Sequence, residues 1–256
     1  TRASLLTGKY PARLGFTTAT PQRDTYYNQN LATAEGSYLH DVLDHHDEIG
    51  IEMAWINGSS NTAIPSGAAG DNGWDETTIA EALSGYHSAF IGKWHVGGHG
   101  APGYTPADQG FEALSWFDAG GSQYFNWRPE WDDRSTKHFP AFPAEECMLG
   151  YSGKETGEEY LTDDLTKQAL DFIDERSQID GEPFFLYFCH FAVHSPNQAK
   201  KEDVAYFEGK DTKVGNEHSN ATYAGMIGSL DQSVGKILQK LEEKFKPKKV
   251  RVVQLE

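Results

Sequence analysis

The sequence predicts an α/β fold with a mainly parallel, mixed sheet flanked by helices. Two apolar runs, Tyr86–Ile91 and Phe184–Cys189, have the composition of strands buried within a sheet. Two other stretches, Tyr160–Ile173 and Tyr223–Phe245, place apolar residues every three or four positions, which is typical of amphipathic helices. Strands that alternate with helices favour a parallel sheet with helices on its faces.

The N-terminal third of the chain contains two shorter predicted helices. We expect Thr1–Thr7 to be helical and to end at Gly8, because glycine commonly ends helices. Asp75–Leu83 is expected to form a short helix, with Asp75 as its N-cap. The strand at Tyr86–Ile91 should then end at Gly92.

Two long segments are expected to be largely irregular. Residues 11–76 are rich in Gly, Asn, Thr and Pro, with one strand-like run at 51–56. Residues 97–155 are also loop-rich and contain many aromatic side chains. Both segments are therefore expected to connect the regular elements rather than to build the sheet.

Composition excludes several classes of protein. The chain has 256 residues, of which 38% are hydrophobic, and this is enough to form a core and argues against disorder. The formal net charge of −16 makes nucleic acids and anionic membranes poor partners. No apolar run is long enough to predict a membrane-spanning helix. Cys147 and Cys189 are too few for a disulfide scaffold or a CxxC zinc site.

Basic and imidazole side chains follow the two predicted strands. Lys93 and His95 follow the first strand, and His190 and His194 follow the second. Ligands of open α/β sheets bind outside the carboxyl ends of the strands, so these residues would face a ligand. Such a cluster in an acidic protein suggests an anionic ligand, and Arg2 could add bidentate contacts to its oxygens. Each residue alone could be structural or solvent-exposed, and their common position favours a site.

Four aromatic residues of the loop-rich segment have two interpretations. They could stack on sugar rings of a ligand, or they could pack in the core and anchor loops. The four residues are Trp116, Tyr124, Trp127 and Trp131.

Basic residues gather at the end of the long predicted helix. They could bind phosphate or another polyanion, or they could be solvated charges that a helix C-terminus favours. The residues are Lys236, Lys240, Lys244, Lys246, Lys248, Lys249 and Arg251.

Four segments resemble those of a known family, in the same order. Gly85–His95, GYHSAFIGKWH, matches the second signature of the type I sulfatases, and Thr1–Gly8 is similar to the tail of the first signature, Cys-x-Pro-Ser/Thr/Ala-Arg. Phe184–Pro196 resembles the family's strand and histidine loop, and Tyr223–Leu238 the helix before its last metal-binding strand. The chain therefore resembles the formylglycine-dependent, arylsulfatase-like sulfatases of the alkaline-phosphatase-like superfamily.

This resemblance implies a sulfuric ester hydrolase acting on a sulfated carbohydrate or an aryl sulfate. The family uses a formylglycine nucleophile and a divalent cation, Ca²⁺ or Mg²⁺. By resemblance, Arg2 would hold the nucleophile's geometry, and Lys93 would neutralise charge on the sulfate and the nucleophile. His95 would act as a base in sulfate release, and His194 would contact the sulfate or the leaving oxygen. Lys93 and His194 would thus bind substrate, and none of these four residues is expected to bind the metal.

The resemblance also implies a fragment truncated at both ends. Residues 1–256 would be part of the N-terminal catalytic domain, without its first strand and its last metal-binding strand. The family Cys should lie three residues before Thr1, so this chain by itself is expected to be inactive. The complete protein would need a formylglycine-generating or other sulfatase-maturing enzyme. The resemblance also suggests that the protein is exported to the periplasm, the lysosome or the extracellular space. No nucleic-acid partner and no membrane-spanning helix are expected.

Two alternatives remain open at this point. A phosphonate monoester hydrolase or phosphodiesterase of the same superfamily would share these motifs. A sulfatase-like binding protein that has lost the nucleophile would keep the fold without the reaction.

Overall fold

The structure of the protein is a computed structural model. It describes residues 2–10, 77–94, 106–117, 122–128, 159–210, 219–245 and 250–253. In chain order the elements are α1 (Arg2–Thr7), α4 (Ile79–Ala82), β1 (His87–Lys93), the 3-10 helix η2 (Ala107–Gln109), β2 (Glu112–Phe117), α7 (Leu161–Ser177), β3 (Phe184–Cys189), α8 (Lys201–Glu208) and α9 (Ala221–Phe245). No helix in these ranges is long and apolar enough to cross a membrane.

The described strands form a parallel sheet in the order β2-β1-β3. β1 pairs with β3 from His87 opposite Phe184 to Gly92 opposite Cys189. Its pairing with β2 shifts register between Phe90 and Gly92. Six of the seven residues of β1 are buried, because it is the central strand, whereas most of β3 is only half-buried. The predicted α/β class with a parallel sheet is therefore confirmed.

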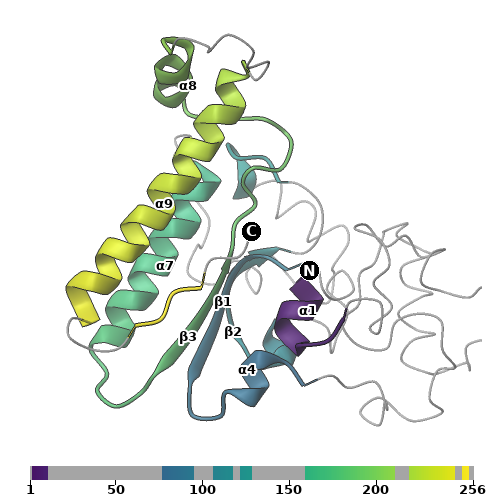
Figure 1. Ribbon diagram of the computed structural model, residues 1–256, viewed down its shortest axis with the longest axis vertical. Coiled ribbons are helices and arrows are strands. Elements are labelled where there is room, and N and C mark those ends of the chain that lie inside the picture. Colours follow the sequence, from purple (N-terminus) through teal and green to yellow (C-terminus); the bar gives the residue numbers. More distant parts are fainter. Residues whose placement is uncertain are drawn as a thin grey trace, which may run out of the picture.

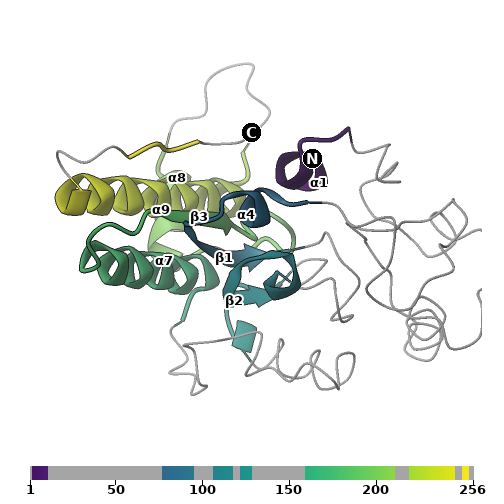
Figure 2. The ribbon, with the colours of Figure 1, turned by 90° about the horizontal axis from the view of Figure 1, so that it is seen from below.

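Helices lie on both faces of the sheet. Figures 1 and 2 show α7 and α9 side by side on one face, and α1 and α4 on the other. On the α7–α9 face, the ring of Phe184 packs 5.5 Å from that of Phe172. On the opposite face, the ring of Tyr187 lies 5.5 Å from Phe90 and 6.2 Å from Phe111. Alternate residues of β3 thus contribute to two different packing layers.

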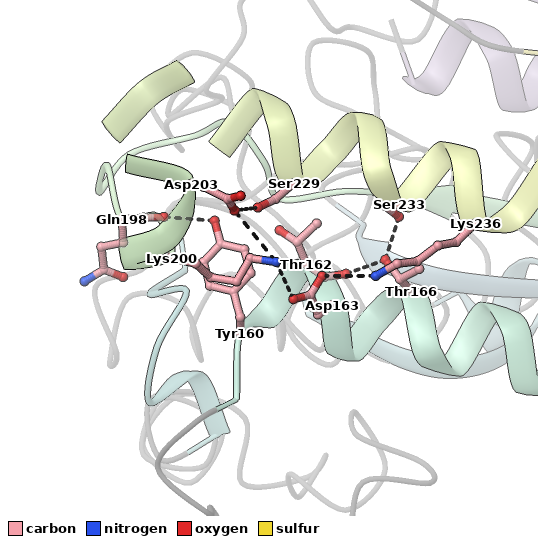
Figure 3. Close-up of polar contacts among 10 residues, drawn as sticks. All are labelled: Tyr160, Thr162, Asp163, Thr166, Gln198, Lys200, Asp203, Ser229, Ser233 and Lys236. Carbon is pink, nitrogen blue, oxygen red and sulfur yellow. Dashed lines mark hydrogen bonds and ion pairs between the residues drawn. The ribbon is translucent and has the colours of Figure 1, made fainter. Parts of the chain in front are cut away.

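Polar side chains join α7, α8 and α9 where these helices pack against one another (Figure 3). We call this set of side chains the polar seam. Three pairs make it: Thr166 Oγ1 with Ser233 Oγ at 2.5 Å, Ser229 Oγ with Asp203 at 3.0 Å, and Lys200 Nζ with Asp163 at 2.8 Å. Small hydroxyl side chains let the helices approach closely, and the hydrogen bonds satisfy polar atoms that would otherwise be buried without partners.

The elements differ from the predictions in four places. The N-cap of α4 is Thr78 rather than Asp75, because the Thr78 side chain and Glu81 form a reciprocal capping box. The loop-rich segment 97–155 contains strand β2, and α8 was not predicted. β1 also continues through Gly92 to Lys93. The strand-like run at 51–56 lies outside the described residues.

Gly92 is the tightest point between β1 and β3. Its φ is +102°, and a Cβ at this position would lie 1.8 Å from the carbonyl oxygen of Cys189. The neighbouring atom belongs to the backbone of a paired strand, so it cannot move without breaking the pairing. Only glycine therefore fits here.

Replacing Gly92 by Ala should lower the free energy of unfolding by roughly 3–5 kcal/mol, from strained φ and overpacking together. Urea denaturation of the complete protein measures this change. Gly235→Ala is a matched control, because Gly235 lies in α9 with nothing within 4 Å of its virtual Cβ. That change should raise stability by about 0.5–1 kcal/mol. Equal effects of the two substitutions would contradict the constraint at Gly92.

Candidate functional site

Lys93 is the last residue of β1, at the carboxyl edge of the sheet. It is paired with Phe117 of β2 and follows directly after the Gly92 contact with β3. Sequence reasoning places its side chain outside the core, but only 7% of the residue is exposed. A buried cation of this kind supplies positive charge in a region from which water is largely excluded, where charge acts strongly.

Arg2 approaches the same strand ends from α1. Its guanidinium is close enough to influence the side chains of Tyr187 and Cys189, which lie on one face of β3. Burial raises the pKa of the Tyr187 hydroxyl and of the Cys189 thiol, and the charge of Arg2 opposes both shifts. Both groups therefore stay neutral at physiological pH. Arg2 thus lies near the end of β3, and the neighbouring strand β1 ends at Lys93.

His194 lies farther along the chain, on the segment that leads from β3 to α8. Its side chain is exposed, and its Nδ1 lies 2.8 Å from the carbonyl oxygen of Ser195. The Tyr124 hydroxyl donates a 3.0 Å hydrogen bond to the backbone carbonyl of His194. His194 is therefore held through its backbone while its ring faces solvent. His95 lies outside the described residues.

His190, immediately after β3, is half-buried as a residue, and its ring is turned toward α9. Its Nε2 lies 3.3 Å from Ser233 Oγ, and its ring centroid is 4.0 Å from that of Phe188. Within the described part of the chain, Nδ1 is buried and has no hydrogen-bond partner. Burial lowers the pKa of His190 to about 4, so the imidazole is neutral at neutral pH.

The structure decides between the two interpretations of the aromatic residues. Trp116 is 4% exposed, and Tyr124 and Trp127 are fully buried, so these three pack in the core. The indole N–H of Trp127 donates to Asp164 at 2.7 Å. They cannot stack on a sugar, and Trp131 lies outside the described residues.

The lysines of α9 are paired with α7. Lys240 and Lys244 contact Asp174 at 2.6 and 2.8 Å, and Lys236 lies 3.9 Å from Asp163. These hydrogen bonds, with the charges of the two lysines, lower the pKa of Asp174. These three lysines therefore join two helices, whereas Lys246, Lys248 and Lys249 lie outside the described residues.

Sequence reasoning missed three residues that contact the predicted site residues. Tyr187 and Cys189 lie beside Arg2, and the Tyr124 hydroxyl donates to the backbone carbonyl of His194. Alternation along β3 puts Tyr187 and Cys189 on one face, which could have identified them as a pair. Nothing local in the sequence connects Tyr124 with a residue 70 positions later.

The described residues do not fit a metal site. No group of three or more His, Cys, Asp or Glu side chains in these ranges could hold an ion. Cys189, the described cysteine, is 8% exposed and belongs to the core. Residues outside the described ranges would have to supply any metal ligands and the nucleophile.

Comparison with known proteins gives a consistent result. The Sulfatase family model matches residues 50–254. The chain is 30% identical over 250 residues to N-acetylgalactosamine-6-sulfatase of Canis lupus familiaris, covering 94% of this chain and 37% of that protein. It is 29% identical over 136 residues to an arylsulfatase of Klebsiella aerogenes, covering 52% of this chain and 27% of that protein.

A solved structure shares the fold. The crystal structure of Ps i-CgsB superposes with a TM-score of 0.58 at 28% identity, over 95% of this chain and 44% of that one. The same protein in complex with k-i-k-neocarrahexaose matches with a TM-score of 0.53 at 26% identity, again over 95% of this chain and 44% of that one. The chain described here thus corresponds to less than half of each of these proteins.

The neutral, buried His190 should make stability depend on pH. Its pKa is lower in the folded state than in the unfolded chain, so its stabilising contribution is lost as pH falls from about 6.5 to about 4. The size of this loss is about 3 kcal/mol. Urea denaturation of the complete protein at pH 7 and pH 4.5 should show a smaller acid loss for His190→Gln than for the wild type. An unchanged acid loss in the variant would contradict a buried neutral imidazole.

Proposed function

Because the chain belongs to the sulfatase family, with a match from residue 50 to residue 254, we propose that the complete protein hydrolyses sulfuric esters. The chain spans 37% of the length of the canine N-acetylgalactosamine-6-sulfatase. The sulfatase activity is therefore proposed for a larger protein of which this chain is a part. The observation that carries the proposal is that Lys93 ends β1 while Arg2 lies beside Tyr187 and Cys189 near the end of the neighbouring strand β3. Two fixed cations near these strand ends suit a substrate whose transferring group is an oxyanion.

The proposed roles follow from charge and position. Lys93 neutralises negative charge on the sulfate, and its burial makes that interaction strong. Arg2 orients the nucleophile from the N-terminal helix, beside Tyr187 and Cys189 of β3. His194, with an exposed ring, contacts the sulfate or the leaving oxygen, and His95 acts as the base in sulfate release.

The substrate we propose is a sulfated carbohydrate. The name of the mammalian relative specifies a sulfate on N-acetylgalactosamine, and Ps i-CgsB was crystallised with an oligosaccharide. Both likenesses cover nearly all of this chain. An aryl sulfate is the matched artificial substrate, because its leaving group reports turnover without requiring recognition of a sugar.

Maturation and cofactors belong to the complete protein. Formylglycine supplies the nucleophile in this family, and a divalent cation stabilises charge on the sulfate. We propose both for the complete protein, together with a sulfatase-maturing enzyme and export. Cys189 is not the formylglycine precursor, because His190, Phe191 and Ala192 follow it where the family signature has x-Pro-Ser/Thr/Ala.

Comparing an aryl sulfate with the matched aryl phosphate tests the reaction class. The complete protein should cleave the sulfate with the higher kcat/KM. A higher kcat/KM for the phosphate or phosphonate ester would favour the phosphonate monoester hydrolase or phosphodiesterase. Cleavage of neither ester, in protein carrying formylglycine, would favour a binding protein.

Substitution of Lys93 tests the site assignment. Lys93→Ala and His95→Ala should each lower kcat by about 10²-fold, because each removes a donor that acts in the transition state. Lys167→Ala is a control for loss of a lysine, because Lys167 is 69% exposed and pairs with Asp171 on α7. Since Lys93 is buried, thermal unfolding of each variant must show that it is folded at the assay temperature. Near-normal kcat for folded Lys93→Ala would remove Lys93 from the site.

A further inference from the structure

The segment between β3 and α8, residues 190–200, carries His194. It has no regular secondary structure, so no ladder of backbone hydrogen bonds fixes its path. The exposed His194 ring makes its own contacts only with the adjacent Ser195 among those described. The position of this ring therefore depends on what holds the backbone of the segment.

Tyr124 contacts this segment at two points. Its hydroxyl donates to the carbonyl oxygen of His194 at 3.0 Å, and its backbone N–H donates to Gln198 Oε1 at 2.7 Å. Tyr124 is completely buried, so its hydroxyl has little freedom to choose another partner. One fixed residue thus contacts residues four positions apart in the segment.

Tyr124 is in turn fixed by the start of α7. Its carbonyl accepts a 2.8 Å hydrogen bond from the backbone N–H of Leu161, and its ring stacks on Tyr160 with centroids 5.6 Å apart. The Tyr160 hydroxyl donates to the carbonyl of Gln198 at 2.9 Å (Figure 3). Two stacked tyrosines therefore hold the segment at different residues, and only Tyr124 holds it at His194.

We propose that Tyr124 is a positioning residue that sets the place of the His194 ring at the active site. This inference rests on the proposed function, in which His194 touches the substrate. The hydrogen bond from Tyr124 fixes the orientation of the peptide group between His194 and Ser195, and therefore the direction from which the imidazole leaves the backbone. Loss of the hydroxyl lets that peptide group rotate and shifts the ring, and a shift of about 1 Å can cost about 10²-fold in rate.

A purely structural role for Tyr124 predicts something different. Tyr124→Phe and Tyr160→Phe each remove one hydroxyl that donates to a backbone carbonyl of the same segment, at 3.0 and 2.9 Å. If the hydroxyls only stabilise the fold, both variants lose similar thermal stability and similar activity. If Tyr124 acts through His194, only Tyr124→Phe loses substantial activity.

The experiment measures kcat and KM of the complete protein with an aryl sulfate, in a double-mutant cycle of Tyr124→Phe and His194→Ala. Tyr124→Phe should lower kcat about tenfold or more with little change in KM, and should cost little further in the His194→Ala background. Tyr160→Phe should keep kcat within about twofold, as should the surface control Tyr206→Phe, where Tyr206 is 59% exposed. Equal fold losses with and without His194 would overturn the proposal.

Hydrogen exchange tests the same inference without turnover. Tyr124→Phe should speed amide exchange in residues 190–198 while exchange in β1 stays as in the wild type. Unchanged exchange in 190–198 would overturn the positioning role. A wild type that cleaves no sulfate ester would overturn the proposed function alone, because the exchange result stands independently of it.

Discussion

The parallel pairing of β1 with β3 depends on Gly92, where the two backbones come too close for any side chain. A Cβ there would lie 1.8 Å from the Cys189 carbonyl oxygen, and the φ of +102° disfavours any other residue. The register shift against β2 occurs at the same place. The pairing with β3 itself keeps an unbroken register up to Gly92 opposite Cys189, and Lys93 follows directly. The position of Lys93 beside the end of β3 therefore follows from this contact.

The two faces of the sheet differ in how their polar side chains are used. The α7–α9 face is closed by aromatic packing and by the polar seam, and its charges are neutralised by pairing between helices. Burial disfavours the charge on Lys200, but its hydrogen bond to Asp163 and the nearby carboxylates raise its pKa. The other face carries Tyr187 and Cys189 toward Arg2. The cations of α9 are thus used between helices, whereas Arg2 and Lys93 remain at the strand ends.

The sequence predicts the elements whose pattern is local. The strands β1 and β3 and the helices α7 and α9 follow from apolar runs and helical periodicity. Strand β2 escapes prediction because Glu112–Phe117 mixes charged, small and aromatic residues, and its strand conformation comes from pairing with β1. The N-cap at Thr78 depends on the carboxylate of Glu81 as well as on its own hydroxyl, so a single acidic residue upstream is a weaker signal. Lys93 is predicted at the right strand end, but its burial depends on neighbours that periodicity does not reveal.

The buried aromatic residues show how a site can depend on side chains that never meet a ligand. Tyr124, Tyr160 and Trp127 have the composition expected of a sugar-binding surface, yet each is buried and uses its polar atom inside the protein. In a segment without regular secondary structure, a side-chain hydroxyl that donates to a backbone carbonyl satisfies a group that a strand or helix would pair with another backbone group. The aromatic ring that carries this hydroxyl is closely packed in the core and has one orientation. The hydroxyl oxygen therefore has a fixed position. The sugar of the proposed substrate would then be recognised by exposed side chains, and the buried tyrosines would act only through the backbone that they hold.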